Sequence, residues 1–380
     1  MRLQALARGL ANVGIDVTVH TCPPHYPSGI VDHGYSSWAT KRARDGNLEI
    51  FRSPVLAAPN RGVARRLLDH ASFAGSALAN ARKAGSADVV IAETPPLFLA
   101  AAAPSYARLL GAQLVLHVSD LWPDSVIELG AVSNRHAIRP ARAMERHAYR
   151  GATRIVAPTA GITAQLERDP AAQGKAFWIP PAVDVERFAA PPVRRDGPLR
   201  VVYAGTVGMA QGVTTLVEAA KCAGSALVSL TIAGDGAELD DVRRAARGAS
   251  HIAVLGPVAA DAVPGLYADA DVGAVLLRDR PLFEGALPTK TFEAMAAGRP
   301  VLLAARGEAA ALVEDAGAGR VATPESVDSV TTALIALASC SELELQALGA
   351  RAVACARRFD RGTMLERWLL LLRGMSASPI

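Results

Sequence analysis

The chain has 380 residues, of which 51% are hydrophobic and 20% charged, with a net charge of +4 at pH 7. This length suggests two domains, and the composition allows a large buried core and excludes a disordered chain. Only 5% of the residues are aromatic, so a nucleic-acid surface with interleaved stacking side chains is not expected.

The positive charge is concentrated in the first half of the chain. Residues 1–187 contain 21 Lys and Arg against 15 Asp and Glu, whereas the remainder is slightly acidic. The basic residues around one partly apolar segment are Arg61, Arg65, Arg66, Arg82 and Lys83. They form either an ordinary solvated face or a surface attracted to an anionic bilayer or a diphosphate-lipid acceptor.

Three further features bear on the cellular compartment. The four cysteines, Cys22, Cys222, Cys340 and Cys355, are scattered without CxxC spacing. No apolar run reaches the roughly 18–20 residues of a spanning helix, and the opening "MRLQALARGLANVG" has no signal-peptide core. We therefore expect a reduced, cytoplasmic protein, in which any association with the inner face of the plasma membrane is peripheral.

Apolar, β-branched runs alternate with helical patterns along the whole chain. Buried parallel strands are expected in the first half at residues 16–21, 48–54, 87–93, 112–118 and 153–159. In the second half they are expected at residues 199–205, 227–235, 252–258, 271–277, 299–304 and 317–323. This alternation predicts an α/β protein with two doubly wound, Rossmann-like domains.

The domains are expected at residues 1–188 and 199–357. The segment 189–198, "AAPPVRRDGP", has the Pro, Gly and charge that are typical of a linker. Residues 358–380 predict a C-terminal helix with a strongly apolar face.

The N-terminus departs from the doubly wound pattern, because the chain opens on a helix. The first strand, and the turn after it that normally supplies phosphate-binding glycines, are missing. Either translation starts upstream of Met1, or the first domain lacks its central strand. The second case would leave backbone groups of the neighbouring strands unpaired.

The stretch "VVYAGTVGMAQG" suits a phosphate. Gly205, Gly208 and Gly212 stand between a predicted strand and a predicted helix, where backbone N–H groups can approach a phosphate at a helix N-terminus. The alternative is an ordinary tight turn that packs the helix on the sheet.

In "LPTKTFEAMAAGRP", Lys290 and Glu293 stand one helical turn apart, just after a proline. A capping box with Thr289 would need its glutamate at position 292, so Glu293 has no capping role. A lysine at a helix start can hold a diphosphate, and a carboxylate can accept both hydroxyls of a ribose. The alternative is an i,i+3 ion pair between the two residues.

The stretch "LHVSDLWPDSVIELG" places His117 and Asp120 at the end of a predicted strand, the edge at which open α/β sheets bind ligands. The alternatives are a histidine satisfied by the backbone and an aspartate that caps the next segment. His20 and His25 have no further ligand at metal spacing, so we expect no zinc site.

The order of "IPPAVDVERF", the glycine stretch, "LTIAGDGAEL", and the run from "VLGPV" to "LPTKTFEAMAAGRP" resembles the retaining glycosyltransferases of family 4, which have the GT-B fold. The segments "PHYPSG", "HVSDLWPDSVIELG" and "LPTKTFEAMAAGRP" are similar to the branch of colanic-acid fucosyltransferases and O-antigen N-acetylfucosaminyltransferases. The resemblance implies two Rossmann-like domains facing a cleft. The second would hold most of a nucleotide sugar, the first would approach the acceptor, and the C-terminal helix would cross back to the first.

The resemblance also implies donor-binding residues. Glu293 matches the second glutamate of the family's E-x7-E motif, which binds the donor ribose. The first glutamate would fall on Gly285, with Glu284 one residue away, so the usual contact to the sugar hydroxyls is displaced. Val258 and Gly256 lie in a turn that resembles the segment holding the nucleobase through its backbone.

The cations expected near the diphosphate differ from the family pattern. Thr206 and Gln211 lie near the places where the family commonly has Arg and Lys. Because a buried diphosphate needs cationic partners, Lys290 is the best remaining candidate and Arg278 the second. The histidine of the family's first domain falls on either His117 or Ser119.

The implied activity is retaining transfer of a hexose, such as a deoxyhexose or an N-acetylhexosamine, from a UDP- or GDP-linked sugar. The acceptor would be a lipid-linked saccharide in surface polysaccharide biosynthesis, and no metal or other cofactor is expected. We expect Lys290, His117 and Asp120 to be the catalytic residues. The alternatives are a soluble small-molecule acceptor and a non-catalytic protein that only binds nucleotide sugars.

Overall fold

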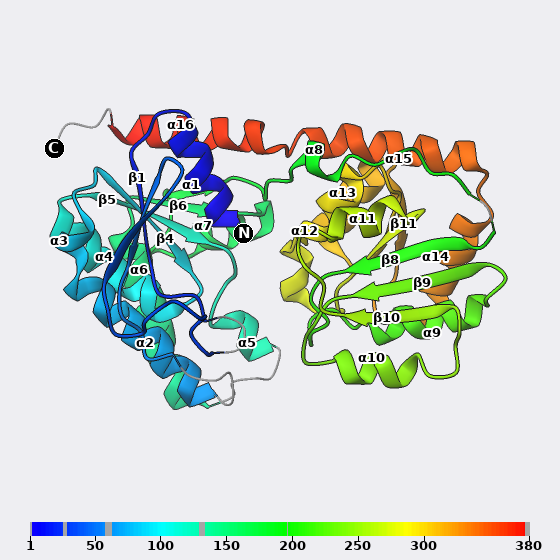
Figure 1. Cartoon of the computed structure of the whole chain (residues 1–380), viewed down its shortest axis with the longest axis horizontal. Helices are drawn as coiled ribbons and strands as arrows, with labels where there is room; N and C mark the ends of the chain where they lie inside the picture. The colour runs from blue at the N-terminus through cyan, green and yellow to red at the C-terminus, as the bar shows by residue number, and fades with distance from the viewer. Residues whose placement is uncertain (1, 26–28, 58–62, 129–133, 196, 377–380) are drawn as a thin grey trace. The chain divides into compact units, whose positions relative to one another are not determined.

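The computed structural model describes residues 2–25, 29–57, 63–128, 134–195 and 197–376. The chain forms two compact units (Figure 1). Unit 1 comprises Met1–Pro158, Ile162–Ile179 and Leu365–Ile380, and unit 2 comprises Thr159–Gly161 and Pro180–Met364. The C-terminal helix α16 (Arg361–Ser376) therefore begins in unit 2 and continues in unit 1.

Unit 1 has two sheets with helices packed against them. Its strands are β1 (Val17–Thr21), β2 (Lys41–Asp45), β3 (Leu48–Arg52), β4 (Val89–Thr94), β5 (Gln113–Val118), β6 (Arg154–Ala157) and β7 (Ala176–Trp178). Its helices are α1 (Arg2–Asn12), α2 (Val63–Ala79), α3 (Ala81–Ala84), α4 (Leu97–Leu110), α5 (Asp124–Glu128), α6 (Arg135–Gly151) and most of α7 (Ala160–Arg168).

The two sheets of unit 1 have the orders β1-β3-β2 and β4-β5-β6-β7. All pairs are parallel except β2 with β3. Within the described residues no strand pair joins β1 to β4, although a doubly wound sheet would place one more parallel strand between them. β1 and β4 are thus edge strands of their own sheets. Accordingly, β1 and β4 are mostly half-buried, whereas β5 is buried almost throughout.

Unit 2 is a doubly wound domain around one parallel sheet. Its strands are β8 (Leu199–Ala204), β9 (Val228–Ala233), β10 (Ile252–Gly256), β11 (Val272–Leu276), β12 (Val301–Ala304) and β13 (Gly319–Ala322). Its helices are α8 (Val185–Phe188), α9 (Thr214–Ala223), α10 (Leu239–Ala245), α11 (Val263–Ala268), η1 (Pro281–Gly285, a 3-10 helix), α12 (Thr289–Ala296), α13 (Gly307–Asp315), α14 (Val327–Ala338) and α15 (Glu342–Arg357).

The strand order β10-β9-β8-β11-β12-β13 reverses direction between β8 and β11. The chain winds outward from β8 to one edge and then returns to continue from β11 to the other. Both strands are apolar and almost completely buried, with helices on each face. Such a reversal leaves a crevice at the carboxyl ends of the two central strands, where open α/β sheets bind ligands.

All eleven strands expected from the sequence are present. Two further strands were missed. β2 reads "KRARD" and is mostly exposed, so it has no apolar run, and β7 has only three residues. A polar edge strand of this kind carries no periodic apolar signal.

The expected domain boundary at residue 188 and the linker at 189–198 need correction. Unit 2 begins at Pro180, and the supposed linker packs on it. Val193 is only 2% exposed and belongs to the core of unit 2. The carbonyl of Pro191 accepts a hydrogen bond from the buried Arg299. The segment has the prolines and charges that are typical of a linker, but it is attached to unit 2 through Val193 and Pro191.

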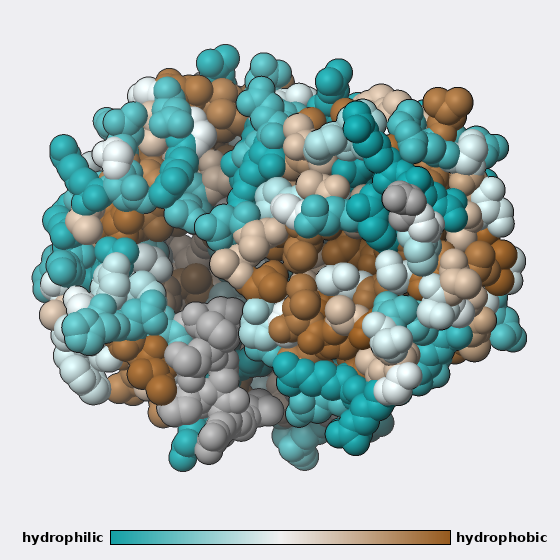
Figure 2. Space-filling model, turned by 45° about the vertical axis from the view of Figure 1, so that its right-hand side comes forward, coloured by the Kyte–Doolittle hydropathy of each residue, from teal (hydrophilic) through white to brown (hydrophobic). Residues whose placement is uncertain are grey.

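Among the described residues no single helix is long and apolar enough to span a membrane. One bent pair, α14 with α15, meets the criteria of length and composition only when its members are joined across a 112° bend, and several of its apolar side chains belong to the core of unit 2. On the face drawn in Figure 2, hydrophobic residues gather between larger hydrophilic areas.

The two central strands of unit 2 are tied together by a buried carboxylate. Asp271, directly before β11, is completely buried and accepts hydrogen bonds from the backbone N–H of Arg200 (2.8 Å) and from its guanidinium (2.6 and 3.1 Å). We expect Asp271→Ala to lower the free energy of unfolding by about 2–4 kcal/mol, because it leaves buried donors unpaired. Urea denaturation measures this loss. The exposed pair Asp240–Arg243 provides the control, since Asp240→Ala should change little, and equal effects of the two substitutions would contradict the prediction.

Candidate functional site

The site lies in unit 2, where β8 and β11 end side by side. The chain leaves β8 through residues 205–212, which we call the glycine loop, and leaves β11 through residues 277–288 before entering α12. The strand reversal thus brings together the predicted residues of the glycine loop, Arg278 and Lys290, although up to 85 positions separate Gly205 from Lys290 in the sequence.

The glycine loop is held in close contact with the turn after β9. Gly205 has φ +146° and Gly234 φ +149°, and a Cβ added to Gly234 would lie 1.7 Å from the carbonyl oxygen of Gly205. The backbone N–H of Val207 donates to the carbonyl of Asp235 (2.8 Å). A side chain at position 234 would therefore push the loop away from the sheet edge.

Side chains also fix the glycine loop. The Gln211 side-chain oxygen accepts a hydrogen bond from the N–H of Gly208 (3.1 Å). The hydroxyl of Tyr203 donates to the carbonyl of Thr206 (2.5 Å). Burial, followed by the charge of Glu238, raises the pKa of Tyr203, so the hydroxyl keeps the proton that it donates. The predicted residues Thr206 and Gln211 thus shape the loop in this structure.

Lys290, the second residue of α12, reaches back to this loop. Its Nζ donates to the Tyr203 hydroxyl (2.5 Å) and lies 4.1 Å from the centre of that ring. A Cβ added to Gly205 would be 3.0 Å from Lys290 Nζ. The ammonium group is therefore adjacent to the backbone of the loop. Burial lowers the pKa of Lys290 to about 8, with Glu293 acting in the opposite direction, so the side chain remains mainly protonated at neutral pH.

Glu293 lies one turn further along α12 and is half-buried. Burial raises its pKa, and the charges of Lys290 and Arg187 oppose that rise. Within the described part of the chain, Lys290 and Glu293 form no ion pair with each other, because Lys290 Nζ is directed to Tyr203. The i,i+3 alternative is thus not what this structure adopts. Pro288 occupies the N-cap position of α12 and makes no side-chain cap, which leaves Glu293 without a capping role.

Arg278 follows β11 and uses all three sides of its guanidinium on protein partners. Nε donates to the carbonyl of Met209 (2.6 Å), Nη2 to Glu238 (2.7 Å) and Nη1 to Glu325 (2.9 Å). The residue lies at the predicted place, beside the glycine loop, but its charge is compensated by two carboxylates. A contact from Arg278 to a diphosphate stays a prediction.

The remaining predicted donor-binding residues lie on other segments of unit 2. Glu284 is exposed on η1, and Gly285 ends that helix. Gly256 ends β10, where its carbonyl accepts from the N–H of Gly234 (2.7 Å), and Val258 is half-buried two residues later. The side chain of Arg187 donates to the carbonyl of Ala260 (2.7 Å), which fastens this turn to α8.

In unit 1, His117 lies inside β5 and is only 6% exposed. Its Nδ1 is 3.4 Å from a carboxylate oxygen of Glu93 and 3.3 Å from the hydroxyl of Ser119, and its ring packs against Trp368 of α16 at 5.9 Å. Both polar contacts are to side chains and not to the backbone, and a catalytic role for His117 stays a prediction. Asp120 is half-buried just beyond the carboxyl end of β5, and its catalytic role stays a prediction.

The sequence interpretation missed Tyr203, Arg187, Glu238 and Glu325. Tyr203 stands two residues before Gly205, the first glycine of the loop, which is the signal that could have identified it. The others are brought to the site by chain segments distant in sequence. Arg61 and the middle of "PHYPSG" (26–28) lie outside the described residues. Arg65, Arg66, Arg82 and Lys83 of the predicted basic segment lie on α2 and α3, and all four are exposed.

A second basic surface, which the sequence interpretation did not recognise, lies on α6. Five arginines follow one face of the helix at helical spacing, and we call them the α6 arginine row: Arg135, Arg139, Arg142, Arg146 and Arg150. All five are exposed. Arg142 pairs with Asp124 (3.0 Å) and Arg146 with Asp169 (3.8 Å). The row therefore keeps an excess of positive charge.

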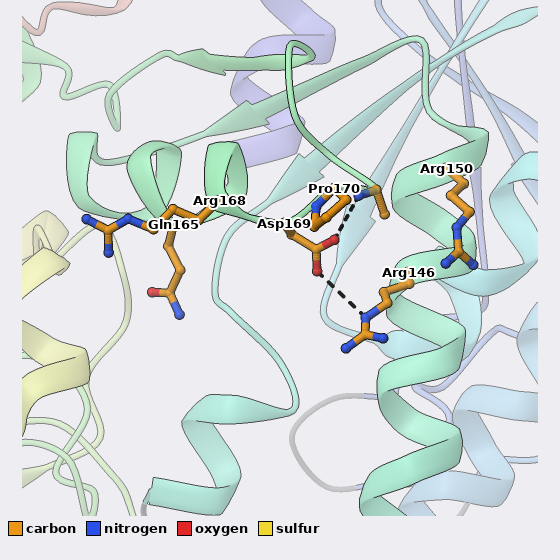
Figure 3. Close-up of a pocket in the computed structure, with 7 residues that line it drawn as sticks. Arg146, Arg150, Gln165, Arg168, Asp169 and Pro170 are labelled. Atoms are coloured by element: carbon orange, nitrogen blue, oxygen red, sulfur yellow. Dashed lines mark hydrogen bonds and ion pairs between the residues drawn. The ribbon is translucent and has the colours of Figure 1, made fainter.

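One end of this row lines a pocket of about 490 Å³ between α6 and the end of α7. Figure 3 shows Arg146 directed at Asp169, with Arg150 one turn away on α6 and Gln165 and Arg168 on α7. Asp169 is also engaged with the backbone N–H of Ala171 (2.8 Å). Arg146 and Arg150 outnumber the single carboxylate here, which makes this end of the pocket suitable for an anion.

Comparison with known proteins agrees with this architecture. A family model described as "Glycosyl transferase 4-like domain" matches residues 1–182, and one described as "Glycosyl transferases group 1" matches residues 198–340. The putative colanic acid biosynthesis glycosyl transferase WcaI of Escherichia coli is 27% identical over 346 residues, which cover 86% of this chain and 84% of that protein.

Two solved structures share the fold. Sucrose-phosphate synthase from Thermosynechococcus elongatus has a TM-score of 0.78 at 17% identity and covers 99% of this chain and 93% of its own. HepE from Anabaena, solved in complex with UDP and glucose, has a TM-score of 0.66 at 19% identity and covers 86% of each chain.

The burial of Lys290 predicts how stability depends on pH. Because its pKa falls from the usual 10.5 to about 8 on folding, the unfolded chain holds this proton more tightly between these two values, and stability rises with pH there. Lys290→Met removes this dependence. The free energy of unfolding of Lys290→Met minus that of the wild type should therefore fall by about 3 kcal/mol from pH 7 to pH 10.5, because only the wild type gains stability from Lys290 over this range. Urea denaturation at several pH values measures it, and a difference independent of pH would contradict the prediction.

Proposed function

Since the chain belongs to the family 4, group 1 glycosyltransferases with the GT-B fold, and is a transferase of polysaccharide or glycolipid biosynthesis, we propose that it moves a hexose from a nucleotide sugar to a saccharide acceptor with retention of configuration. The hexose is a deoxyhexose or an N-acetylhexosamine, and the donor is UDP- or GDP-linked. The observation that carries the proposal is the ammonium group of Lys290 beside the glycine loop at the strand reversal.

The proposed donor lies along this edge of unit 2. Its diphosphate contacts Lys290 and the N-terminus of α12, where the ammonium charge and the helix dipole favour an anion. Its ribose hydroxyls donate to the carboxylate of Glu293, one turn further on. The turn at residues 256–258 offers backbone groups to the base. The UDP complex of HepE concerns a relative in fold and supports a nucleoside diphosphate here by likeness alone.

The chemical role proposed for Lys290 is to stabilise the leaving group. As the bond between the sugar and the diphosphate breaks, negative charge grows on the phosphate, and a pre-placed cation in a partly buried site stabilises that charge. The departing phosphate oxygen then accepts the proton of the attacking acceptor hydroxyl on the same face of the sugar. Asp120 is proposed to act on the acceptor side. No metal is assigned a role in these steps.

The first test of this function measures nucleotide release from UDP- and GDP-sugars with purified protein, with and without lipid-extracted acceptors. We expect Lys290→Met to lower kcat/KM about 100-fold or more, since it removes a charge-assisted contact in the transition state. Glu293→Gln should weaken donor binding about 10- to 100-fold through the loss of its charged hydrogen bonds.

The control for this test is Lys221→Ala, which removes a lysine on α9 whose ammonium group pairs with the nearby Glu218. This substitution should leave both kcat/KM and the affinity for the donor unchanged. Donor binding without release from any sugar would favour the non-catalytic alternative. Release that does not depend on Lys290 or Glu293 would overturn the proposed site.

We further propose that the enzyme is cytoplasmic and acts at an anionic membrane surface on a lipid-linked acceptor, approached by unit 1. The α6 arginine row and the basic start of α2 support this. On α2, Arg65 and Arg66 are exposed next to Leu68, a residue that is 56% exposed. Basic and apolar side chains on one segment suit the headgroup region of a bilayer. A soluble acceptor is the alternative.

Co-sedimentation with vesicles tests the membrane proposal. We expect the protein to bind vesicles that contain phosphatidylglycerol and not pure phosphatidylcholine, and to be released by high salt. The double variant Arg139→Gln/Arg150→Gln should bind roughly 10- to 30-fold more weakly, at about 1 kcal/mol for each arginine. The variant Arg243→Gln/Arg244→Gln on α10 is the matched control. A wild-type protein that stays in the supernatant at low salt would support the soluble acceptor instead.

A further inference from the structure

The turn between β13 and α14 holds a residue in an unfavourable backbone conformation. Glu325 has φ +59°, and among the described residues it is the one non-glycine residue with a positive φ. This left-handed region disfavours L-amino acids that carry a side chain, and glycine would adopt it freely. A glutamate at this position therefore needs contacts of its side chain that offset the backbone strain.

That side chain is engaged with the segment that follows β11. One carboxylate oxygen of Glu325 accepts from Arg278 Nη1 (2.9 Å). The other accepts from the backbone N–H of Asp279 (2.9 Å) and from the guanidinium of Arg280 (3.2 Å). A single carboxylate thus holds three consecutive residues that lie at the carboxyl end of a strand two positions away in the sheet.

Arg278 transmits this constraint to the glycine loop. Its backbone N–H donates to the carbonyl of Ala210 (2.9 Å), and its Nε donates to the carbonyl of Met209 (2.6 Å). Its other terminal nitrogen pairs with Glu238, whose backbone N–H donates to the carbonyl of Val207 (3.0 Å). One guanidinium therefore holds the glycine loop at two points, directly at Met209 and through Glu238 at Val207.

The positive charge of Arg278 already compensates the carboxylate of Glu238. The second carboxylate oxygen of Glu238 is buried and has no hydrogen-bond partner. If the guanidinium turned to a phosphate, Glu238 would be left as a buried, unpaired anion beside the loop that is to receive another anion.

We infer that Glu325 and Arg278 form a latch, with Glu238 as its inner anchor, that fixes the glycine loop in the conformation that receives a nucleoside diphosphate. Arg278 is then a positioning residue and not a phosphate ligand, and Glu325 sets donor affinity without touching the donor. The affinity part rests on the proposed function, whereas the control of loop conformation does not.

Glu325→Gly distinguishes the latch from its alternatives. Glycine at position 325 removes the carboxylate and also relieves the backbone strain, whereas alanine removes only the carboxylate. In urea denaturation Glu325→Gly should therefore lose little stability compared with Glu325→Ala. Hydrogen exchange of the ligand-free protein should nevertheless show amides of residues 205–212 exchanging at least about 10-fold faster in Glu325→Gly than in the wild type. Glu325→Gln, which keeps the hydrogen-bonding shape, should restore part of the protection. The control Glu218→Gln breaks an exposed pair on α9 and should not change loop exchange.

The direction of the change in affinity separates the two roles of Arg278. In calorimetric titrations with UDP and GDP, the latch predicts that Glu325→Gly weakens binding of the preferred nucleotide about 10-fold, with kcat nearly unchanged under saturating donor. If Arg278 were a phosphate ligand restrained by Glu325, the same substitution would release its guanidinium and strengthen binding. Tighter binding in Glu325→Gly would therefore overturn the assignment.

Wild-type exchange rates in the loop of Glu325→Gly would overturn the latch itself, whatever the nucleotide result. Failure of the wild-type protein to bind either nucleotide would instead overturn the proposed donor site and, with it, the effect on affinity. Faster loop exchange in that case would still establish that Glu325 and Arg278 control the loop. The exchange and binding measurements thus separate the failure of the two proposals.

Discussion

The structure of the candidate site depends on one topological constraint, the placement of β8 next to β11. The chain segments that follow these strands turn in opposite directions, so neither helix covers the sheet edge between them. The buried contact from Asp271 to Arg200 fixes the two strands at their amino ends. At the carboxyl ends the same adjacency brings Lys290 to Gly205. Without this pairing, the glycine loop and the lysine would belong to unrelated surfaces.

Electrostatic balance at this edge decides which cation is available to a ligand. Arg278 is matched by Glu238 and Glu325, and Arg306 by the carboxylate of Asp279. Lys290 differs, because its hydrogen-bond partner is the neutral hydroxyl of Tyr203. A lysine that is partly buried beside a neutral hydrogen-bond partner has its charge compensated only in part, here by the nearby Glu293, which costs stability in the empty protein. An anionic ligand would relieve that cost, and this links the lowered pKa of Lys290 to the proposed binding role.

Much of this fold could be predicted from the sequence, because buried parallel strands are continuous apolar runs and need no distant information to be recognised. Lys290 and Glu293 could be singled out as candidates, since their spacing after a proline is a local pattern, and their binding roles stay predictions. The roles of Glu325 and Arg278 could not. They depend on a backbone angle and on contacts between the ends of strands that only the folded sheet brings together. Tyr203 was missed for a different reason, because a tyrosine in a strand is normally a packing residue.

The same distinction explains the error at the domain boundary. Proline, glycine and charge at residues 189–198 indicate a segment that is neither helix nor strand, and the structure agrees at the described positions 189–195 and 197–198. They do not indicate whether such a segment is free or attached. Here the buried Arg299 binds the carbonyls of Pro191, Tyr267 and Ala268, so one side chain from the turn after α12 fastens this segment onto the end of α11. An irregular segment is thus anchored by donors that come from elsewhere in the chain, and its own composition carries no trace of them.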